Sequence, residues 1–451
     1  MDEGGGASAP PDLGAFVRAL RFDALPADVV ACAQRCLLDL VGVAAAGSQL
    51  PSSRLARDHA VAHMGSRERE ARLLFDGRRA SLPGAAFAGA ATIDALDAHD
   101  GHVLTKGHAG VAILPALLAY AEGRECGGRE FLLSVVLGYE VATRAGIALH
   151  ATTADYHCSG AWNALACAAL GARCLPLTDA QLREALGIAE YYGPRGQIMR
   201  VCEAPSMLKD GSSWGAHAGV TAALLAAAGF TGAPAITVER AGEHWRDLGQ
   251  RYRIREQYFK AYPVCRWAQP AIEAALAVQR EHGFAAEHVA SVMIESFREA
   301  IDLGSRCLDP STTDEAQYSL TFPVASALAS GRVGADEVNA AGERHPHVTR
   351  LLPNMTLVED AEFSSLFPAE RWARVRIGLH DGRTFVSQPA RARGNPENPL
   401  SDDEIAGKFH ALADPVLGAA RASRIETLIA ALPSDDSAFA PLREELAQPV
   451  H

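Results

Sequence analysis

The chain has 451 residues, of which 48% are hydrophobic and 21% are charged, and its formal net charge at pH 7 is −12. This length and composition predict a globular protein with more than one core, while the negative charge and the lack of a basic run with interleaved aromatic residues exclude a general nucleic-acid binder. An anionic substrate would therefore need a locally positive pocket, against the overall sign of the field.

The N-terminal stretch "MDEGGGASAPPD" is acidic and rich in Gly and Pro, so we expect a short disordered lead and no signal peptide. Nine cysteines, an odd number without a CxxC pair, favour reduced thiols in a cytoplasmic protein. The most apolar windows, residues 36–47 and 131–149, contain Asp39, and Glu140 with Arg144. These charges predict buried core helices, and we expect neither a membrane nor a nucleic-acid partner.

The first 250 residues predict a succession of helices. In "PADVVACAQRCLLDLVGVAAAG", Pro26 is placed to open a helix, apolar residues follow at helical spacing, and Gly47 ends it. Similar Ala-, Leu- and Val-rich runs between Gly or Pro breaks predict helices within residues 82–98, 110–123, 128–150, 160–177, 178–193 and 212–230. Because small residues let helices pack closely, we expect a large all-helical body.

The pattern changes beyond about residue 285. "VASVMIESF" and "WARVRIGLHDGRTFVSQ" predict strands, and Asp381-Gly382 predicts a tight hairpin turn within the second segment. "QPAIEAALAVQREHG" and "YSLTFPVASALASG" predict helices beside them, and "RGNPENPLSDDE" marks the end of this mixed unit. We therefore expect a mainly α fold with an all-helical domain (1–265 and 401–451) and a smaller α/β domain (266–400), since the last segment returns to helix.

Titratable residues gather in "ALDAHDGHVLTKGHAG", residues 95–110. Such groups are costly to bury, so this stretch is either a solvated loop or a working site. We expect His99 and His102 to be solvated loop residues. Although His and Asp are suitable ligands for zinc or a non-haem metal, the spacing matches no HExxH-type signature, so no metal site is predicted.

Two other stretches suggest chemistry less directly. "GPRGQIMR", residues 193–200, is rich in Gly and Arg but lacks the GxxxxGK[ST] pattern and a preceding strand, so we interpret it as a turn in which Arg195 is a candidate for binding substrate. Ser159 and Ser206 lack a GxSxG elbow, which argues against a serine hydrolase.

Five blocks in chain order resemble the MmgE/PrpD family: "ALDAHDGH" with "GHAGVAILPALLA", "YHCSGAWNALACAA", "SMLKDGSSWGAHAGVTAALLAAAGFTGAP", "KAYPVCRWAQPAIEAAL" and "QYSLTFPVASALASG". The resemblance covers residues 12–430 or so. It implies a large all-helical domain, a smaller α/β lid, an active site between them, a homodimer, and no metal or organic cofactor. The family includes 2-methylcitrate dehydratases, cis-aconitate decarboxylases and iminodisuccinate epimerases.

The resemblance also implies a set of site residues. Those expected to be catalytic are Asp97, His108, His157, Lys209 and Tyr318. Those expected to bind substrate are Lys260 and Arg266, to which Arg195 is added from its own stretch. The chain departs from the family pattern at His99, where an aspartate is usual, and at Gln269, where many members have a histidine, and both departures weaken the transfer of one member's substrate.

These residue types suit proton transfer next to a carboxylate. Its enolate-like transition state needs cations or hydrogen-bond donors and a base of tuned pKa, and we expect His157 to transfer the proton. Dehydration, decarboxylation and epimerisation share this charged intermediate. We expect a cofactor-independent lyase for a small di- or tricarboxylate, foremost a hydro-lyase of the 2-methylcitrate dehydratase type. Decarboxylation and epimerisation are the alternatives within the family, and a non-catalytic organic-acid binding protein is the alternative outside it.

Overall fold

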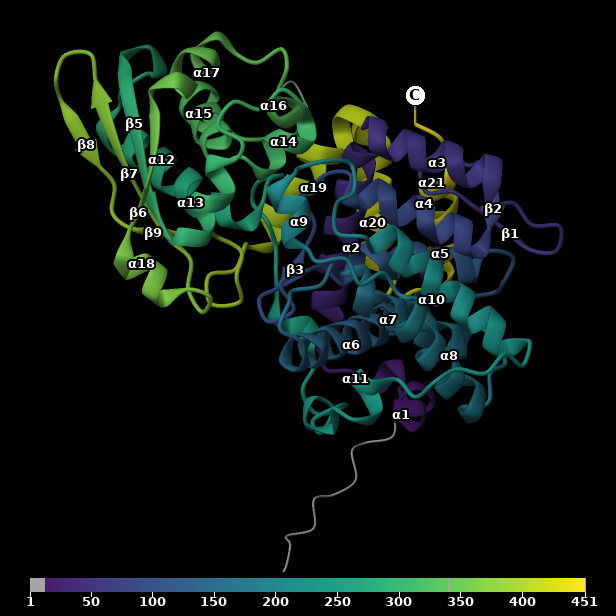
Figure 1. Cartoon of the computed structure of the whole chain (residues 1–451). Coiled ribbons are helices and arrows are strands. Elements are labelled where there is room, and N and C mark those ends of the chain that lie inside the picture. Colours follow the sequence, from purple (N-terminus) through teal and green to yellow (C-terminus); the bar gives the residue numbers. More distant parts are fainter. Residues whose placement is uncertain (1–12, 340, 451) are drawn as a thin grey trace, which may run out of the picture.

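The structure, a computed structural model, describes residues 13–339 and 341–450. The predicted N-terminal lead, residues 1–12, lies outside the described residues. A large helical body and a smaller α/β part lie side by side, and the last helices of the chain return to the body (Figure 1). The predicted mainly helical fold with a smaller α/β part is confirmed.

The body is built from helices that span most of the first 240 residues and the C-terminal segment. They are α1 (Leu13–Ala19), α2 (Ala27–Gly47), α3 (Pro51–His63), α4 (Leu82–Asp94), α5 (Gly110–Ala121), α6 (Gly128–Thr152), α7 (Gly160–Cys174), α8 (Asp179–Tyr192), α9 (Met199–Glu203), α10 (Ser212–Ala227), α11 (Ile236–Glu239), α19 (Asp402–Leu417), α20 (Ala419–Ala431) and α21 (Phe439–Ala447). Two short antiparallel pairs join β1 (Glu70–Arg72) to β2 (Arg79–Ser81) and β3 (Gly101–His102) to β4 (Gln257–Tyr258). Each helix predicted in the first 250 residues is present.

Small residues bring these helices into close contact. A Cβ at Gly219 of α10 would lie 2.3 Å from the carbonyl oxygen of Ala164 in α7, and one at Gly215 would lie 2.5 Å from the Gly160 backbone. Larger residues at these positions would push the two helices apart. By length and composition α2 and α6 could each cross a membrane, but 67% and 94% of their most apolar windows are buried inside the molecule, as expected of core helices.

The C-terminal helix α19 packs against α2 and supports the loop that follows α4. A Cβ at Gly42 of α2 would meet the Cα of Phe409 at 3.2 Å, so the two backbones are close. From the same helix, Lys408 donates hydrogen bonds to Asp39 at 2.5 Å and to the carbonyl oxygen of Ala98 at 2.6 Å. The end of the chain therefore holds a loop that lies more than 300 residues earlier in the sequence.

The α/β part has one mixed sheet with strand order β6-β5-β7-β8, and β9 also pairs with β7. Only the β5–β6 pair is parallel. Its strands are β5 (Val289–Ser296), β6 (Met355–Glu359), β7 (Trp372–Leu379), β8 (Thr384–Val386) and β9 (Ala390–Arg391). Its helices are α12 (Gln269–His282), α13 (Arg298–Ser305), α14 (Thr313–Tyr318), α15 (Thr321–Ser330), α16 (Ala335–Asn339), α17 (Pro346–Leu351) and α18 (Ala361–Leu366).

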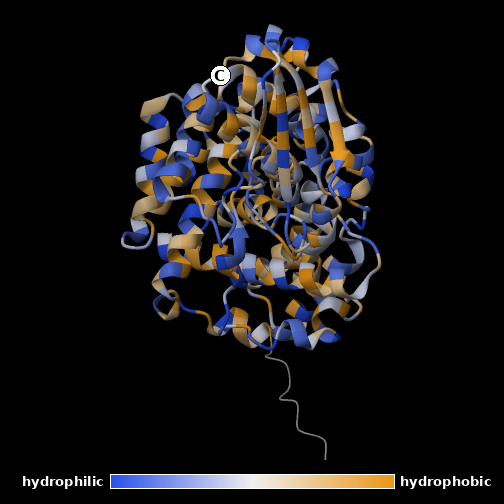
Figure 2. Cartoon of the chain, turned by 90° about the vertical axis from the view of Figure 1, so that its left-hand side faces the viewer, coloured by the Kyte–Doolittle hydropathy of each residue, from blue (hydrophilic) through white to orange (hydrophobic). Residues whose placement is uncertain are grey.

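Both predicted strand segments and the turn at Gly382 are confirmed, whereas β6 was not predicted. Along β7, Val375, Ile377 and Leu379 are at most 4% exposed and pack under α12, while Arg376 faces solvent. Hydrophilic and hydrophobic residues accordingly alternate along the strands of this sheet (Figure 2). This apolar core is separate from that of the body, so the two parts meet at a boundary where polar side chains can gather.

Candidate active site

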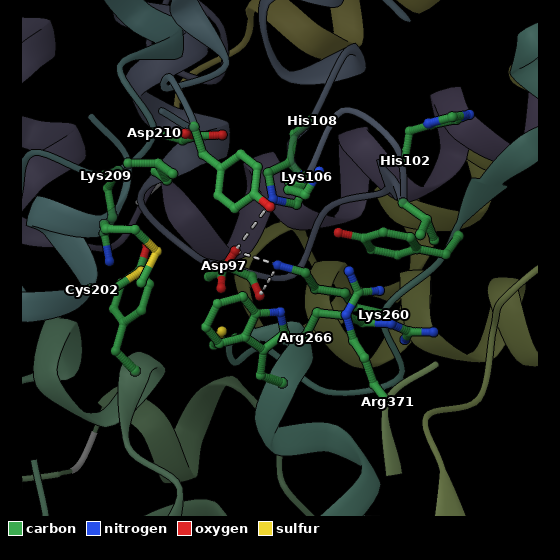
Figure 3. A pocket seen from close by; sticks show the side chains of 18 of the residues that line it. Asp97, His102, Lys106, His108, Cys202, Lys209, Asp210, Lys260, Arg266 and Arg371 are labelled. Carbon is green, nitrogen blue, oxygen red and sulfur yellow. Dashed lines mark hydrogen bonds and ion pairs between the residues drawn. The ribbon is translucent and has the colours of Figure 1, made fainter. Parts of the chain in front are cut away.

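A pocket lies where the body meets the α/β part (Figure 3). The lining comes from the loop after α4, the turns before α10, the segment around β4, and residues of the α/β part. Its titratable side chains are Asp94, Asp97, His102, Lys106, His108, Tyr156, Cys202, Lys209, Asp210, Tyr258, Lys260, Cys265, Arg266, Tyr318 and Arg371.

Residues 95–108 form a tightly held loop at the centre of this pocket. A Cβ at Gly101 would lie 2.6 Å from the Tyr258 hydroxyl, and one at Gly107 would lie 2.2 Å from Oγ of Ser159, so only glycine fits at either position. Between them Lys106 has φ of 51°, in the left-handed region that non-glycine residues rarely adopt. The loop is therefore fixed by its contacts with the segments around it.

The expectation that His99 and His102 are solvated loop residues is wrong, because they are only 1% and 3% exposed. Nδ1 of His99 lies 3.3 Å from the carbonyl oxygen of Leu96, and burial holds the pKa of His99 well below its usual value. His102 accepts a hydrogen bond from the Leu104 amide and donates one from Nε2 to Glu256 at 3.0 Å. The polar, glycine-containing sequence of this loop gave no sign that neighbouring segments would cover it.

Asp97 and Lys260 form a buried ion pair. Lys260 is 1% exposed and donates hydrogen bonds to the carboxylate of Asp97 and, at 3.2 Å, to its carbonyl oxygen. Burial alone would raise the pKa of Asp97, but the charge of Lys260 and its hydrogen bond to Asp97 oppose burial, and this pKa is lowered. Burial likewise opposes ionisation of Lys260, yet Asp97 raises the pKa of Lys260 above its usual value. Both groups are therefore charged at neutral pH.

His108 has the arrangement of a general base. Its Nδ1 lies 2.6 Å from the carbonyl oxygen of Asp100, which can only accept a hydrogen bond, so Nδ1 carries the hydrogen and Nε2 carries a lone pair. Nε2 lies 4.0 Å from the carboxylate of Asp97. Burial and the charge of Lys260 lower the pKa of His108 to about 4. The imidazole is therefore neutral at pH 7 and its free nitrogen can accept a proton.

Helix α14 of the α/β part links Lys209 to the Asp97 loop. Lys209 is 5% exposed, pairs with Asp314 at 2.7 Å and donates to Oε1 of Gln317 at 3.0 Å. The same oxygen of Gln317 accepts the backbone N–H of Asp97 at 2.8 Å. The sequence analysis missed Gln317, and the one available signal was its place directly before Tyr318. Lys209 also has a positive φ of 49°, so its backbone is strained where its ammonium meets the pocket.

Two further carboxyl groups line the pocket, and the sequence analysis did not single them out. Burial raises the pKa of Asp94 to about 6, and burial together with the charge of Asp94 raises the pKa of Asp210 well above its usual value. The amide and hydroxyl of Ser159 donate hydrogen bonds to Asp210. Because two neighbouring buried carboxylates cannot both ionise easily, this pair retains a proton near neutral pH.

Tyr318 and Arg266 complete the set that the structure brings together from the predicted residues. Tyr318 is 8% exposed at the end of α14, and burial raises its pKa, so its hydroxyl is protonated at neutral pH. Arg266 donates to the carbonyl oxygen of Arg393 at 2.7 Å and to Asn395 at 2.5 Å. Burial lowers the pKa of Arg266 to about 10, which leaves it charged.

His157 and Arg195 do not line the pocket. Nδ1 of the half-buried His157 lies 3.3 Å from the carbonyl oxygen of Arg195, whose side chain is exposed. The preceding residue, Tyr156, lines the pocket instead. The geometry therefore gives His108, and not His157, direct access to a bound molecule.

Asp97, His99 and His108 place ligand atoms within 4.8 Å of one another, and they are the one cluster of this kind among residues 13–339 and 341–450. A carboxylate and two imidazoles suit a divalent transition metal. The ammonium of Lys260 already bonds to Asp97, however, and would face and repel such an ion. The arrangement therefore favours proton transfer among organic side chains over ion binding.

The pocket as a whole suits a small molecule with several negative charges. Five cationic side chains surround a neutral imidazole, a carboxylate and groups that retain a proton. Cations can hold carboxylates and stabilise negative charge that develops on a neighbouring carbon, and His108 can accept or return a proton there.

Family models match most of the chain. The MmgE/PrpD N-terminal domain matches residues 11–245, and the MmgE/PrpD C-terminal domain matches residues 262–434. The cis-aconitate decarboxylase-like protein oryM of Aspergillus oryzae is 25% identical over 92% of this chain and 93% of its own length. A cis-aconitate decarboxylase of Aspergillus terreus is 24% identical over 96% and 94%. The cis-aconitate decarboxylase of Mus musculus is 24% identical over 74% and 72%.

Proposed function

This chain belongs to the MmgE/PrpD family, and on that premise we propose that it is a lyase acting on a small di- or tricarboxylate. One observation carries the proposal: the neutral imidazole of His108 faces the Asp97–Lys260 ion pair inside a pocket lined by five cationic side chains. An organic-acid binding protein would need the cations but would gain nothing from a buried imidazole that is neutral and has a free nitrogen.

The reaction that we propose first is decarboxylation of an unsaturated tricarboxylate such as cis-aconitate. The relatives named above support it, because two are named cis-aconitate decarboxylases and the third is named a cis-aconitate decarboxylase-like protein. Dehydration of 2-methylcitrate, which the sequence analysis favoured, has no such support. Identities of 24–25% favour a reaction class and leave the substrate to be measured.

In a decarboxylation the carbon–carbon bond to one carboxylate breaks, carbon dioxide leaves, and the electron pair stays on the substrate until one proton is added to carbon. Lys209 and Lys260 are placed to stabilise that negative charge. A bound polyanion also raises the pKa of a neighbouring imidazole, because it favours the charged form. We therefore assign His108 as the group that takes up a proton when the substrate binds and delivers it to carbon.

Dehydration is the second candidate, and the neutral state of His108 favours it. In that reaction Nε2 removes a proton from the carbon next to a carboxylate, and the hydroxyl on the neighbouring carbon leaves as water after receiving a proton. Tyr318 keeps its proton at neutral pH and lines the same pocket, so it is the candidate donor.

Incubation with cis-aconitate, 2-methylcitrate and citrate in deuterated water, followed by proton NMR, tests the proposal. Decarboxylation predicts loss of carbon dioxide from cis-aconitate and one deuterium on carbon in the product. A new alkene signal from 2-methylcitrate would establish dehydration instead. Saturable binding of all three compounds without turnover or exchange would refute a lyase and establish a binding protein.

The matched control for this assay is His217→Gln. His217 lies on α10 and is half-buried, but it does not line the pocket. The variant removes one imidazole from the molecule without touching the proposed site, so its activity should equal that of the unmodified protein.

A further inference from the structure

Among the residues that the structure describes, three cations in the pocket wall have no carboxylate within ion-pair distance. Lys209 and Lys260 pair with Asp314 and Asp97. In contrast, among the residues that the structure describes, no carboxylate lies within ion-pair distance of Lys106, Arg266 or Arg371, although all three line the same pocket. A half-buried or buried charge without a counter-charge is unfavourable unless a ligand supplies one.

Arg371 gives the clearest sign of a missing partner. It lies immediately before β7, and its Nε is buried with no hydrogen-bond partner. Within the described part of the chain no oxygen accepts a hydrogen bond from its guanidinium, whose Cζ lies 5.9 Å from the centre of the Phe367 ring. Burial lowers the pKa of Arg371, and the more distant charge of Glu397 opposes this effect only in part. A structural arginine at a domain boundary would normally bond to backbone carbonyls or carboxylates.

Lys106 and Arg266 line the pocket with Arg371, and each is positioned by its local contacts. The left-handed backbone of Lys106, with φ of 51°, places its ammonium 4.2 Å from the ring centre of Tyr156. Arg266 donates hydrogen bonds to neutral carbonyl and amide oxygens, and its Cζ lies 4.6 Å from the centre of the Tyr258 ring. Aromatic faces and neutral oxygens orient these cations without neutralising them.

We propose that Lys106, Arg266 and Arg371 form a second anion subsite, which binds a carboxylate of the substrate remote from the carbon at which His108 acts. The inference rests on the proposed function only in that the substrate occupies this pocket. Figure 3 shows Arg266 and Arg371 with Lys260 on one side of Asp97 and Lys209 on the other. A substrate with carboxylates at both ends can therefore meet cations on both sides.

The subsite limits the class of substrate. A planar guanidinium binds a carboxylate through two parallel hydrogen bonds, so Arg371 suits a terminal carboxylate. A molecule with a single carboxylate can satisfy either Lys209 and Lys260 or the second subsite, but not both. We therefore expect dicarboxylates and tricarboxylates to bind and monocarboxylates of equal length to bind poorly.

Calorimetric titration of glutarate and pentanoate tests the subsite without turnover. The two compounds share a five-carbon chain and differ in one carboxylate. We expect glutarate to bind the unmodified protein at least about 10-fold more tightly, the size of one charge-assisted contact. The variant Arg371→Gln should remove most of that ratio. Arg376→Gln, on the exposed face of β7, the strand that Arg371 precedes, is the matched control and should keep it.

Thermal unfolding separates a binding role from a structural one. Arg371→Gln removes an uncompensated charge, so its Tm should equal or exceed that of the unmodified protein while the glutarate-to-pentanoate ratio falls. A lower Tm with an unchanged ratio would show that Arg371 is structural and would overturn the proposal. If Arg371→Gln does not fold, Lys106→Gln takes its place, and an unchanged ratio there overturns the proposal equally.

Three more outcomes show whether the carboxylate assignment, the lyase proposal or the subsite proposal fails. Inorganic phosphate that binds more tightly than glutarate, and loses affinity in Arg371→Gln, would overturn the assignment to a carboxylate. If Arg371→Gln loses the glutarate-to-pentanoate ratio but no tested substrate is turned over, the subsite proposal is supported and the lyase proposal is refuted. If a substrate is turned over but the glutarate-to-pentanoate ratio is unchanged in Arg371→Gln, the lyase proposal is supported and the subsite proposal is refuted.

Discussion

Replacement of His108 by glutamine should abolish most of the activity while the protein remains folded. The change removes the lone pair on Nε2 and the 2.6 Å hydrogen bond from Nδ1 to the carbonyl oxygen of Asp100. Loss of a general acid or base lowers kcat by about 10²- to 10⁴-fold, or about 3 to 5 kcal/mol in the barrier. Exchange of the imidazole donor for the glutamine amide should cost only about 1 kcal/mol of unfolding free energy, because the amide can donate to the same carbonyl oxygen.

The same substitution should change how stability depends on pH. Burial lowers the pKa of His108 from 6.5 to about 4, so the unfolded chain takes up a proton in this range that the folded protein does not. Protonation of the unfolded chain therefore lowers the unfolding free energy as the pH falls from about 6.5 to about 4. The neutral His108 carries no such penalty above about pH 6.5, and the total change is roughly 3 kcal/mol. His108→Gln should flatten this part of the curve of unfolding free energy against pH.

Steady-state kinetics at pH 7 and urea unfolding between pH 4 and 7 provide the two measurements. His157→Ala is the comparison, since the sequence analysis assigned proton transfer to His157 while the structure places it outside the pocket lining. We expect a smaller loss of kcat in His157→Ala than in His108→Gln. A near-normal kcat in folded His108→Gln, with a large loss in His157→Ala, would refute the assignment of His108.

Three further predictions concern metal, assembly and the buried loop. Activity should survive dialysis against a strong chelator, and loss of activity that zinc, iron or manganese restores would assign the Asp97, His99 and His108 cluster to a metal. Light scattering should give twice the chain mass, because the family resemblance implies a homodimer, and a fully active monomer would contradict it. His102→Gln should lower the unfolding free energy by about 1 to 2 kcal/mol in urea unfolding, since it disturbs the bond to Glu256, whereas an unchanged stability would mean that this contact contributes little.

Much of the fold could be predicted because its signals are local. Pro26 and Gly47 bound a helix by their own backbone preferences, and the alternation of Val375, Ile377 and Leu379 specifies a strand with one buried face. The exposed pattern of β6 is weaker, with only Met355 buried, and it gave no comparable signal. Its pairing with β5 is a tertiary contact that periodicity does not encode.

The candidate site was harder to predict because its properties arise between distant segments. The resemblance supplied Asp97, His108, Lys209, Lys260 and Tyr318, all of which line the pocket. It could not supply the burial of the loop after α4, which depends on Lys408 and the segment around β4.

Arg371 illustrates the same limit on a single residue. In the sequence it is one arginine among many near a predicted strand. Only the folded chain shows that it lines a cationic pocket and that its buried Nε has no hydrogen-bond partner among residues 13–339 and 341–450. A charged residue that is important because it has no partner in the folded protein cannot be recognised from residue type or spacing.

The most direct test of the whole account is a crystal structure of the protein with propane-1,2,3-tricarboxylate. This compound has three carboxylates but neither a hydroxyl group to eliminate nor a double bond next to a carboxylate, so it should bind without reacting. The account predicts that the ligand lies between Lys209 and Arg371, with a carbon next to a carboxylate within reach of Nε2 of His108. Binding elsewhere on the molecule, or an empty pocket at saturating concentration, would contradict it.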